Sequence, residues 1–207
     1  MNVLIVAATQ FEIEPVLNEN IKADILITSA GIPATIFHLT KKLSGKKYDL
    51  VINAGIAGSF GDRFNLSEVA LVSEDTFGDI GINENESFKT LFETGLMNEN
   101  DFPFTNGWLV NNNIDFGKWN LPLAKAITIN KITDDLLQIE KLQQKFLPDI
   151  ESMEGAAFHY VCLHQKINFL QVRGISNRVG ERDKAKWQMK SALQNLNKEL
   201  LQIIENL

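Results

Sequence analysis

The chain has 207 residues, of which 44% are hydrophobic and 22% are charged. This balance is typical of a folded globular protein and not of a disordered one, and the length suits one domain with a sizeable core. The formal net charge of -6 argues against nucleic acid or an anionic membrane as a partner, because both require clustered Lys and Arg. A neutral or cationic small molecule is compatible with this charge.

The single cysteine and the short apolar runs indicate where the protein resides. No disulfide can form within the chain because Cys162 is its only cysteine, so we expect a cytoplasmic location. The apolar run at residues 3–8 has no basic segment before it and is too short for a signal peptide. No stretch approaches the roughly 20 apolar residues of a membrane span. We find no linker and expect a single domain over residues 1–207.

Short, nearly continuous apolar runs recur along the chain, each bounded by Gly, Asn or Asp. This pattern predicts strands that are buried on both faces, as in a parallel sheet. The runs cover residues 3–8, 25–28, 50–53, 69–72, 126–129 and 169–172.

Helical patterns lie between several of these runs. Apolar residues at three- and four-residue spacing predict helices over residues 33–43 and 134–146, and a longer one from about 187 to 204. The basic run Lys41, Lys42, Lys46 and Lys47 is typical of a solvated helix end. The alternation of strands and helices predicts an α/β fold with a mostly parallel central sheet.

The segment 83–113 differs from the rest, because it is rich in Asn, Glu, Phe and Gly and has weak periodicity. A long irregular stretch inside a compact domain is usually a functional loop or lid, or a poorly ordered excursion. The sequence does not favour either interpretation.

Four polar or glycine-containing segments follow predicted strands, at the sheet edge where open α/β sheets bind ligands. They are residues 9–14, 53–58, 152–157 and 173–180. The last three have a structural alternative: a glycine turn is often only a tight connection, Glu154 could complement a helix dipole, and Arg173 could form a surface salt bridge.

The four segments together resemble the nucleoside phosphorylase/nucleosidase family, in particular the methylthioadenosine/adenosylhomocysteine nucleosidases. The matching blocks, in order and spacing, are AATQFE (7–12), NAGIAG (53–58), ESMEGAA (151–157) and RGISN (173–177). The continuation SNRVGERD (176–183), with Trp187 after it, is similar to the futalosine-hydrolysing branch of this family. The resemblance implies a single-domain, three-layer α/β/α sandwich with a mixed, mostly parallel central sheet.

The resemblance also implies a role for each matching residue. Glu12 matches the carboxylate that orients and activates the attacking water, and Arg173 matches the arginine beside that water. Glu154 matches the acid that holds the ribose hydroxyls, while Met153 packs against the sugar. The family needs no cofactor and no metal, and the three histidines of the chain do not form a ligand cluster.

On the base side, Ala57 and Gly58 match the turn that lines sugar and base, and Asn177 takes the place of the aspartate that assists departure of the base. Two departures from the family pattern stand out: Ile56 replaces a serine that helps to hold the water, and Asn177 is an amide. An amide donates hydrogen bonds but cannot act as a general acid near neutral pH. It therefore favours hypoxanthine over adenine as the leaving group.

These residue types suit the cleavage of an N-glycosidic bond. The reaction develops positive charge on the ribose and negative charge on the purine, so a site needs a base for the water, a clamp for the sugar and a donor at the purine. The reaction implied by the resemblance is hydrolysis of futalosine to hypoxanthine and dehypoxanthine futalosine, in a route to menaquinone. The implied partner is a small-molecule purine nucleoside, and family members are homo-oligomers, dimers or larger.

Three alternatives remain. A phosphorylase is disfavoured, because it must bind a phosphate dianion and the first of the chain's four arginines is Arg63. A nucleosidase for methylthioadenosine, adenosylhomocysteine or aminodeoxyfutalosine is disfavoured by Asn177 and by the segment at 182–183. A non-catalytic nucleoside-binding protein on the same fold is disfavoured by the matching Glu12, Glu154 and Arg173.

Overall fold

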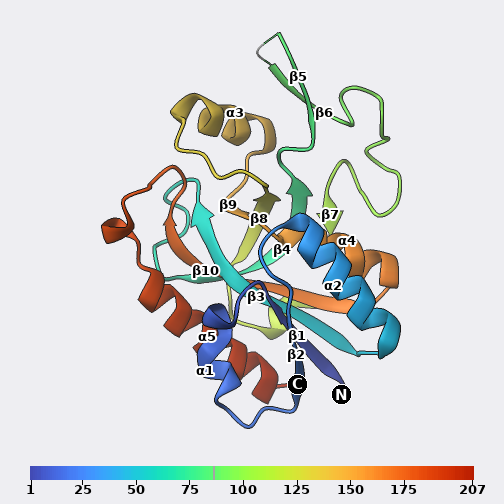
Figure 1. Cartoon of the computed structure of the whole chain (residues 1–207), viewed down its shortest axis with the longest axis vertical. Coiled ribbons are helices and arrows are strands. Elements are labelled where there is room, and N and C mark those ends of the chain that lie inside the picture. The colour runs from blue at the N-terminus through green and yellow to red at the C-terminus, as the bar shows by residue number, and fades with distance from the viewer. Residues whose placement is uncertain (86) are drawn as a thin grey trace.

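The structure, a computed structural model, describes residues 1–85 and 87–207. At its centre is an eight-stranded sheet in the order β10-β4-β8-β9-β3-β1-β2, with β7 beside β4 (Figure 1). Its strands are β1 (Val3–Ala7), β2 (Ala23–Ile27), β3 (Leu50–Ser59), β4 (Val69–Phe77), β7 (Leu109–Val110), β8 (Leu123–Thr128), β9 (Ile150–Ser152) and β10 (Asn168–Arg178).

The sheet is mixed and mostly parallel, which confirms the prediction. Strand β1 runs parallel to β2 and β3, β3 runs parallel to β10, and β8 runs parallel to β4 and β9. The pairs β10–β4, β3–β9 and β4–β7 are antiparallel. Because β10 pairs with β3 as well as with β4, the strands β10, β4, β8, β9 and β3 close into a ring. A small apolar cluster with one or two residues from each of these strands fills it.

Helices cover both faces of the sheet, which gives the expected three layers (Figure 1). The helices are α1 (Glu14–Leu17), α2 (Ile32–Gly45), α3 (Leu136–Phe146), α4 (Gly155–Gln165) and α5 (Met189–Glu205), with 3-10 turns η1 (Gln10–Ile13), η2 (Phe116–Lys118) and η3 (Lys184–Lys186). Helix α5 packs with α1 on one face, and α2 packs with α4 on the other.

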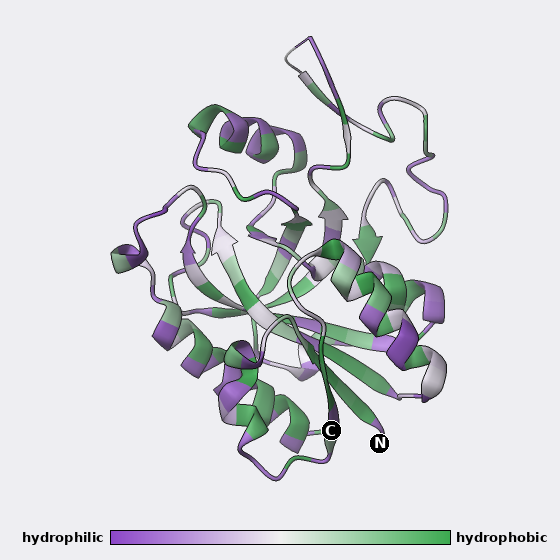
Figure 2. Ribbon diagram, viewed as in Figure 1, coloured by the Kyte–Doolittle hydropathy of each residue, from purple (hydrophilic) through white to green (hydrophobic). Residues whose placement is uncertain are grey.

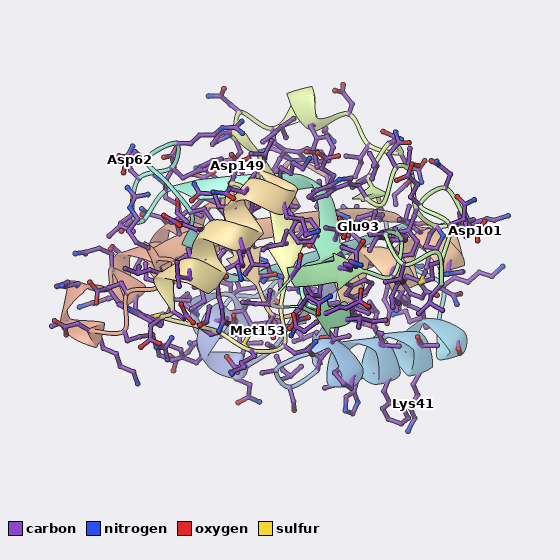
Figure 3. All side chains as sticks on the ribbon, turned by 90° about the horizontal axis from the view of Figure 1, so that it is seen from above. Lys41, Asp62, Glu93, Asp101, Asp149 and Met153 are labelled. Atoms are coloured by element: carbon purple, nitrogen blue, oxygen red, sulfur yellow. The ribbon has the colours of Figure 1, made fainter. Side chains whose placement is uncertain are left out.

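Hydropathy along the ribbon explains this arrangement. The strands are largely hydrophobic, whereas α2 and α5 alternate hydrophobic and hydrophilic residues around the helix (Figure 2). Leu39 of α2 and Leu196 of α5 are fully buried, so each helix turns its apolar stripe to the sheet. Lys41 projects from the outer side of α2 into solvent (Figure 3), as expected for the basic run.

Two strands extend beyond their apolar runs. The segment Asn53–Gly58 was expected to form a glycine turn after a strand, but it lies within β3, which continues to Ser59. Arg173 was expected where a strand ends, but β10 continues to Arg178. The physical reason is that β3 and β10 pair with each other along nearly their whole length, so their backbone groups stay bonded beyond the apolar residues.

The segment 83–113 is partly ordered by strands of its own. A hairpin of β5 (Gly81–Glu84) and β6 (Ser87–Thr90) stands out at one end of the molecule (Figure 1). Farther along, Phe104 and Leu109 are buried in a cluster with Ala156 of α4. This part of the segment is therefore anchored to the domain. Within the described residues, no helix is both long and apolar enough to cross a membrane.

Candidate active site

A cavity of 260 Å³ opens beside β3, β9 and β10, next to the start of α4. Six of the seven predicted site residues line it, namely Glu12, Ala57, Gly58, Met153, Glu154 and Asn177. The seventh, Arg173, is only 1% exposed and lies in the strand beneath the cavity. The structure therefore brings together residues from four distant parts of the sequence.

A local hydrogen-bonded turn fixes the carboxylate of Glu12. Thr9 precedes η1 and forms a capping box with Glu12, whose Oε2 accepts from the Thr9 backbone N–H at 2.9 Å and from its hydroxyl at 3.1 Å. Glu12 Oε1 accepts from the backbone N–H of Ile56 at 3.4 Å. The side chain of Ile56 replaces the family serine, yet its backbone still contacts the carboxylate. Glu12 is 8% exposed and faces the cavity.

Arg173 is held from the neighbouring strand. Its Nη2 donates to Asn53 Oδ1 at 2.5 Å, and its Nε has no hydrogen-bond partner in the described chain. Arg173 lies directly across the ladder from Gly55. An added Cβ on Gly55 would overlap Arg173 Nη1 and lie 2.9 Å from Glu12 Oε1. The absence of a side chain at Gly55 therefore leaves room for both the guanidinium and the carboxylate. Because Arg173 is buried, the surface salt bridge considered for it is wrong.

Glu154 stands at the N-terminal cap of α4 and is buried in the same site. Its Oε1 accepts from the backbone N–H of Gly31 at 2.9 Å. Burial raises the pKa of Glu154, the charge of Arg173 lowers it, and the negative charge of Glu12 raises it further. The charges of Arg173 and Glu12 therefore both act on Glu154. Met153, labelled in Figure 3, lies in the short connection between β9 and α4 and lines the cavity.

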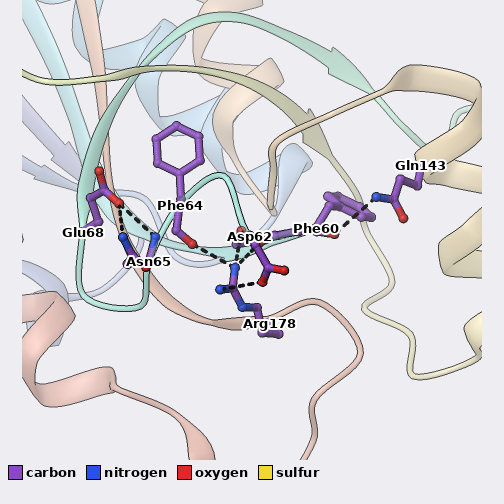
Figure 4. A network of polar contacts seen from close by, with 9 residues as sticks. Phe60, Asp62, Phe64, Asn65, Glu68, Gln143 and Arg178 are labelled. Carbon is purple, nitrogen blue, oxygen red and sulfur yellow. Dashed lines mark hydrogen bonds and ion pairs between the residues drawn. The ribbon is translucent and has the colours of Figure 1, made fainter.

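Local contacts orient the amide of Asn177 at the other end of the cavity. Its Oδ1 accepts from the Ser176 hydroxyl at 2.7 Å, and its Nδ2 donates to the Arg178 carbonyl at 2.8 Å. Arg178 in turn donates to the carbonyls of Gly61 and Phe64 and pairs with Asp62, so it ties this strand to the loop after β3 (Figure 4). An amide nitrogen carries two hydrogens, and one of them remains for a ligand.

The cavity also contains residues that had no role predicted from the sequence. Glu151, Arg182 and Trp187 line it. Glu151 is 6% exposed, and burial raises its pKa to about 7. Glu151 could have been found from the sequence, because it is a charged residue in the block at 151–157, whose other residues apart from Glu154 are small or apolar. No residue of the described part of 83–113 lines this cavity.

None of the three histidines lines this cavity. The described residues include no group of three or more His, Cys, Asp or Glu side chains arranged to hold a metal ion. His159 is fully buried in α4, where its Nδ1 lies 2.9 Å from the Leu109 carbonyl. Burial lowers the pKa of His159 to about 4, so this histidine is a neutral packing residue.

The proteins most similar in sequence that were found are futalosine hydrolases. The chain is 29% identical over 153 residues to the futalosine hydrolase of Thermus thermophilus, and the match covers 72% of this chain and 67% of that protein. It is 25% identical over 178 residues to the futalosine hydrolase of Acidothermus cellulolyticus, covering 84% of this chain and 72% of that protein. No protein-family model matches the sequence.

Solved structures match over the whole chain. The futalosine hydrolase of Helicobacter pylori superposes with a TM-score of 0.82 at 14% identity, covering 100% of this chain and 98% of the other. The 5'-methylthioadenosine/S-adenosylhomocysteine nucleosidase of Neisseria meningitidis, solved with methylthio-immucillin-A, gives a TM-score of 0.81 at 16% identity, covering 100% and 99%. These similarities confirm the fold predicted from the sequence.

Proposed function

Because this chain is a homologue of curated futalosine hydrolases and has the nucleoside phosphorylase/nucleosidase fold, we propose that it hydrolyses the N-glycosidic bond of futalosine. The products are hypoxanthine and dehypoxanthine futalosine, as in the futalosine route to menaquinone. One observation carries the proposal: Arg173 Nη1 and Glu12 Oε1 both lie close to Gly55, and the charges of both residues act on the buried Glu154.

The proposed mechanism assigns the water to Glu12. This carboxylate takes a proton from a water molecule, and the water oxygen bonds to C1′ of the ribose as the C1′–N9 bond breaks. Arg173 orients the water from beside Glu12. Glu154 accepts hydrogen bonds from the ribose hydroxyls and is negatively charged, so it stabilises the positive charge that develops on the sugar.

The leaving purine takes the electron pair of the broken bond. The free N–H of Asn177 donates to the base and stabilises this charge. The base then takes up a proton from solvent, and Glu12 releases to solvent the proton that it took from the water. Ala57, Gly58 and Met153 form the wall against sugar and base. The proposal needs no cofactor and no metal ion.

A substrate panel tests the proposed function. Purified protein is incubated with futalosine, inosine, methylthioadenosine and aminodeoxyfutalosine, each with and without inorganic phosphate, and free base is measured. We expect the highest kcat/KM for futalosine and no dependence on phosphate. A preference for methylthioadenosine would assign the chain to another nucleosidase, and a requirement for phosphate would make it a phosphorylase. Release of no base from any substrate would leave only a binding function.

We propose that the protein is cytoplasmic and forms a homo-oligomer, a dimer or larger. Its single cysteine, Cys162, supports the location. Exposed apolar residues support assembly: Leu96 is 68% exposed and Ile80 is 36% exposed, and Ile80 lines a second, mainly apolar cavity of 290 Å³. Light scattering at micromolar concentration tests this, and a fully active monomer would contradict it.

A further inference from the structure

Glu151 is a buried carboxylate in the candidate site to which the proposed mechanism gives no task. It lies in β9, lines the cavity and is 6% exposed. Its Oε2 is buried and has no hydrogen-bond partner among the residues that the structure describes. A buried acceptor without a donor costs free energy, and a buried carboxylate costs more than a neutral group. Such an atom in a ligand cavity indicates a donor on the ligand.

Glu151 belongs to the same end of the cavity as Asn177. Glu151 pairs with Gly58 across the β3–β9 ladder, and Asn177 pairs with Gly58 across the β3–β10 ladder. The place where a Cβ of Gly58 would stand is 3.5 Å from Glu151 Cγ and 3.3 Å from Asn177 Nδ2. A donor and an acceptor therefore flank one glycine. The third of the three atoms nearest to that position belongs to Val179, and none belongs to Glu12 or Arg173.

The chemistry of the base identifies the donor. A carboxylate only accepts hydrogen bonds, so its partner on the ligand must carry an N–H or O–H. In a hypoxanthine nucleoside N9 is bonded to the ribose, and N1–H is the single N–H of the base. In an adenine nucleoside N1 carries a lone pair instead, which a carboxylate repels.

We infer that Glu151 accepts the N1–H of the 6-oxopurine base and thereby selects hypoxanthine over bases that lack this hydrogen. The inference rests on the proposed function for the identity of the base. Asn177 donates to an acceptor of the same ring. The two side chains together therefore recognise one hydrogen-bond donor and one acceptor of the base. Burial raises the pKa of Glu151 to about 7, and the positive charge of Arg182, which lines the same cavity, opposes this shift and favours the ionised form that the contact requires.

The experiment compares hypoxanthine with 1-methylhypoxanthine, in which a methyl group replaces the N1 hydrogen. Calorimetry gives Kd for both bases with the wild type, Glu151→Ala and Glu151→Gln. We expect the wild type to bind hypoxanthine more tightly by about tenfold to a hundredfold, the range for a hydrogen bond to a charged group. Glu151→Ala should reduce this preference to within about threefold, because it removes the acceptor. Glu151→Gln should give an intermediate preference, because its amide oxygen is a neutral acceptor.

A matched control is Glu74→Gln, the same change on β4 at a carboxylate that pairs with Lys125 at 3.3 Å outside this cavity. It should keep the wild-type preference. An unchanged preference in Glu151→Ala would overturn the inference. If Glu151 had a purely structural role, its loss would weaken the binding of both bases by the same factor. Futalosine turnover by the wild type is measured in parallel. If futalosine is not hydrolysed but the N1 preference depends on Glu151, the proposed substrate fails and the base contact stands.

Discussion

Glu12 and Arg173 both lie against Gly55, where an added Cβ would overlap Arg173 Nη1 and lie 2.9 Å from Glu12 Oε1. The two charged groups reach this point from different elements, η1 and β10. Their positions are thus set by the pairing of β10 with β3 and by the capping box at Thr9. A small change at Gly55 must displace one of them.

Gly55→Ala should lower kcat on futalosine by about a hundredfold, the usual effect of moving a reacting group by about 1 Å. The new methyl group pushes the guanidinium or the carboxylate from its place, while the strand itself accepts alanine. Gly45→Ala is the control, because a Cβ there meets nothing within 4 Å. Steady-state kinetics and circular dichroism are measured on both variants. Normal turnover in folded Gly55→Ala would show that this geometry is not needed.

Glu12→Gln should lower kcat by roughly a hundredfold or more, because an amide cannot take a proton from water. The amide keeps the shape of the side chain, so hypoxanthine should still bind. The exposed neighbour Glu14 provides the control, and Glu14→Gln should behave as the wild type. Single-turnover kinetics separate the chemical step from binding. Wild-type kcat in a folded Glu12→Gln protein would remove Glu12 from the mechanism.

A local pattern in the sequence predicted the strand at the N-terminus, whereas Glu12 was identified by the family resemblance. The apolar run at 3–8 corresponds to β1 at Val3–Ala7. Thr9 and Glu12 stand three residues apart, the spacing of a capping box, so their contact is local. Such features depend only on neighbours in the chain, so a local pattern can contain them.

Contacts between distant segments could not be predicted in this way. Arg173 bonds to Asn53, 120 residues away, and this partner explains its burial. Glu151 lies in the cavity because β9 pairs antiparallel with β3 at Gly58. The ends of β3 and β10 depend on their mutual pairing and not on their own apolar content. The register between strands fixes these positions, and a single sequence does not contain that register in any local pattern.

Asn177→Asp should change the choice of base. The carboxylate must take up a proton before it can donate to hypoxanthine, so the ratio of kcat/KM for futalosine to that for aminodeoxyfutalosine should fall by about tenfold to a hundredfold. Ser176→Ala is the control, because it removes only the hydroxyl that donates to Asn177 Oδ1 at 2.7 Å. It should lower both specificity constants by a similar factor. A ratio that stays constant in Asn177→Asp would show that this amide does not select the base.

Glu151 should also make stability depend on pH. Burial raises its pKa from 4.5 to about 7, so between these values the folded protein holds a proton that the unfolded chain has lost. The stability that this proton provides is fully present below pH 4.5 and is lost as the pH rises through about 7. Glu151→Gln does not titrate, so its free energy of unfolding relative to the wild type should rise between pH 4 and pH 8 by up to about 3 kcal/mol. Asp75, whose pKa burial also raises to about 7, is present in both proteins and cancels in the difference. Urea unfolding at several pH values provides the measurement, with Glu74→Gln as the control, and a difference that does not vary with pH would contradict the prediction.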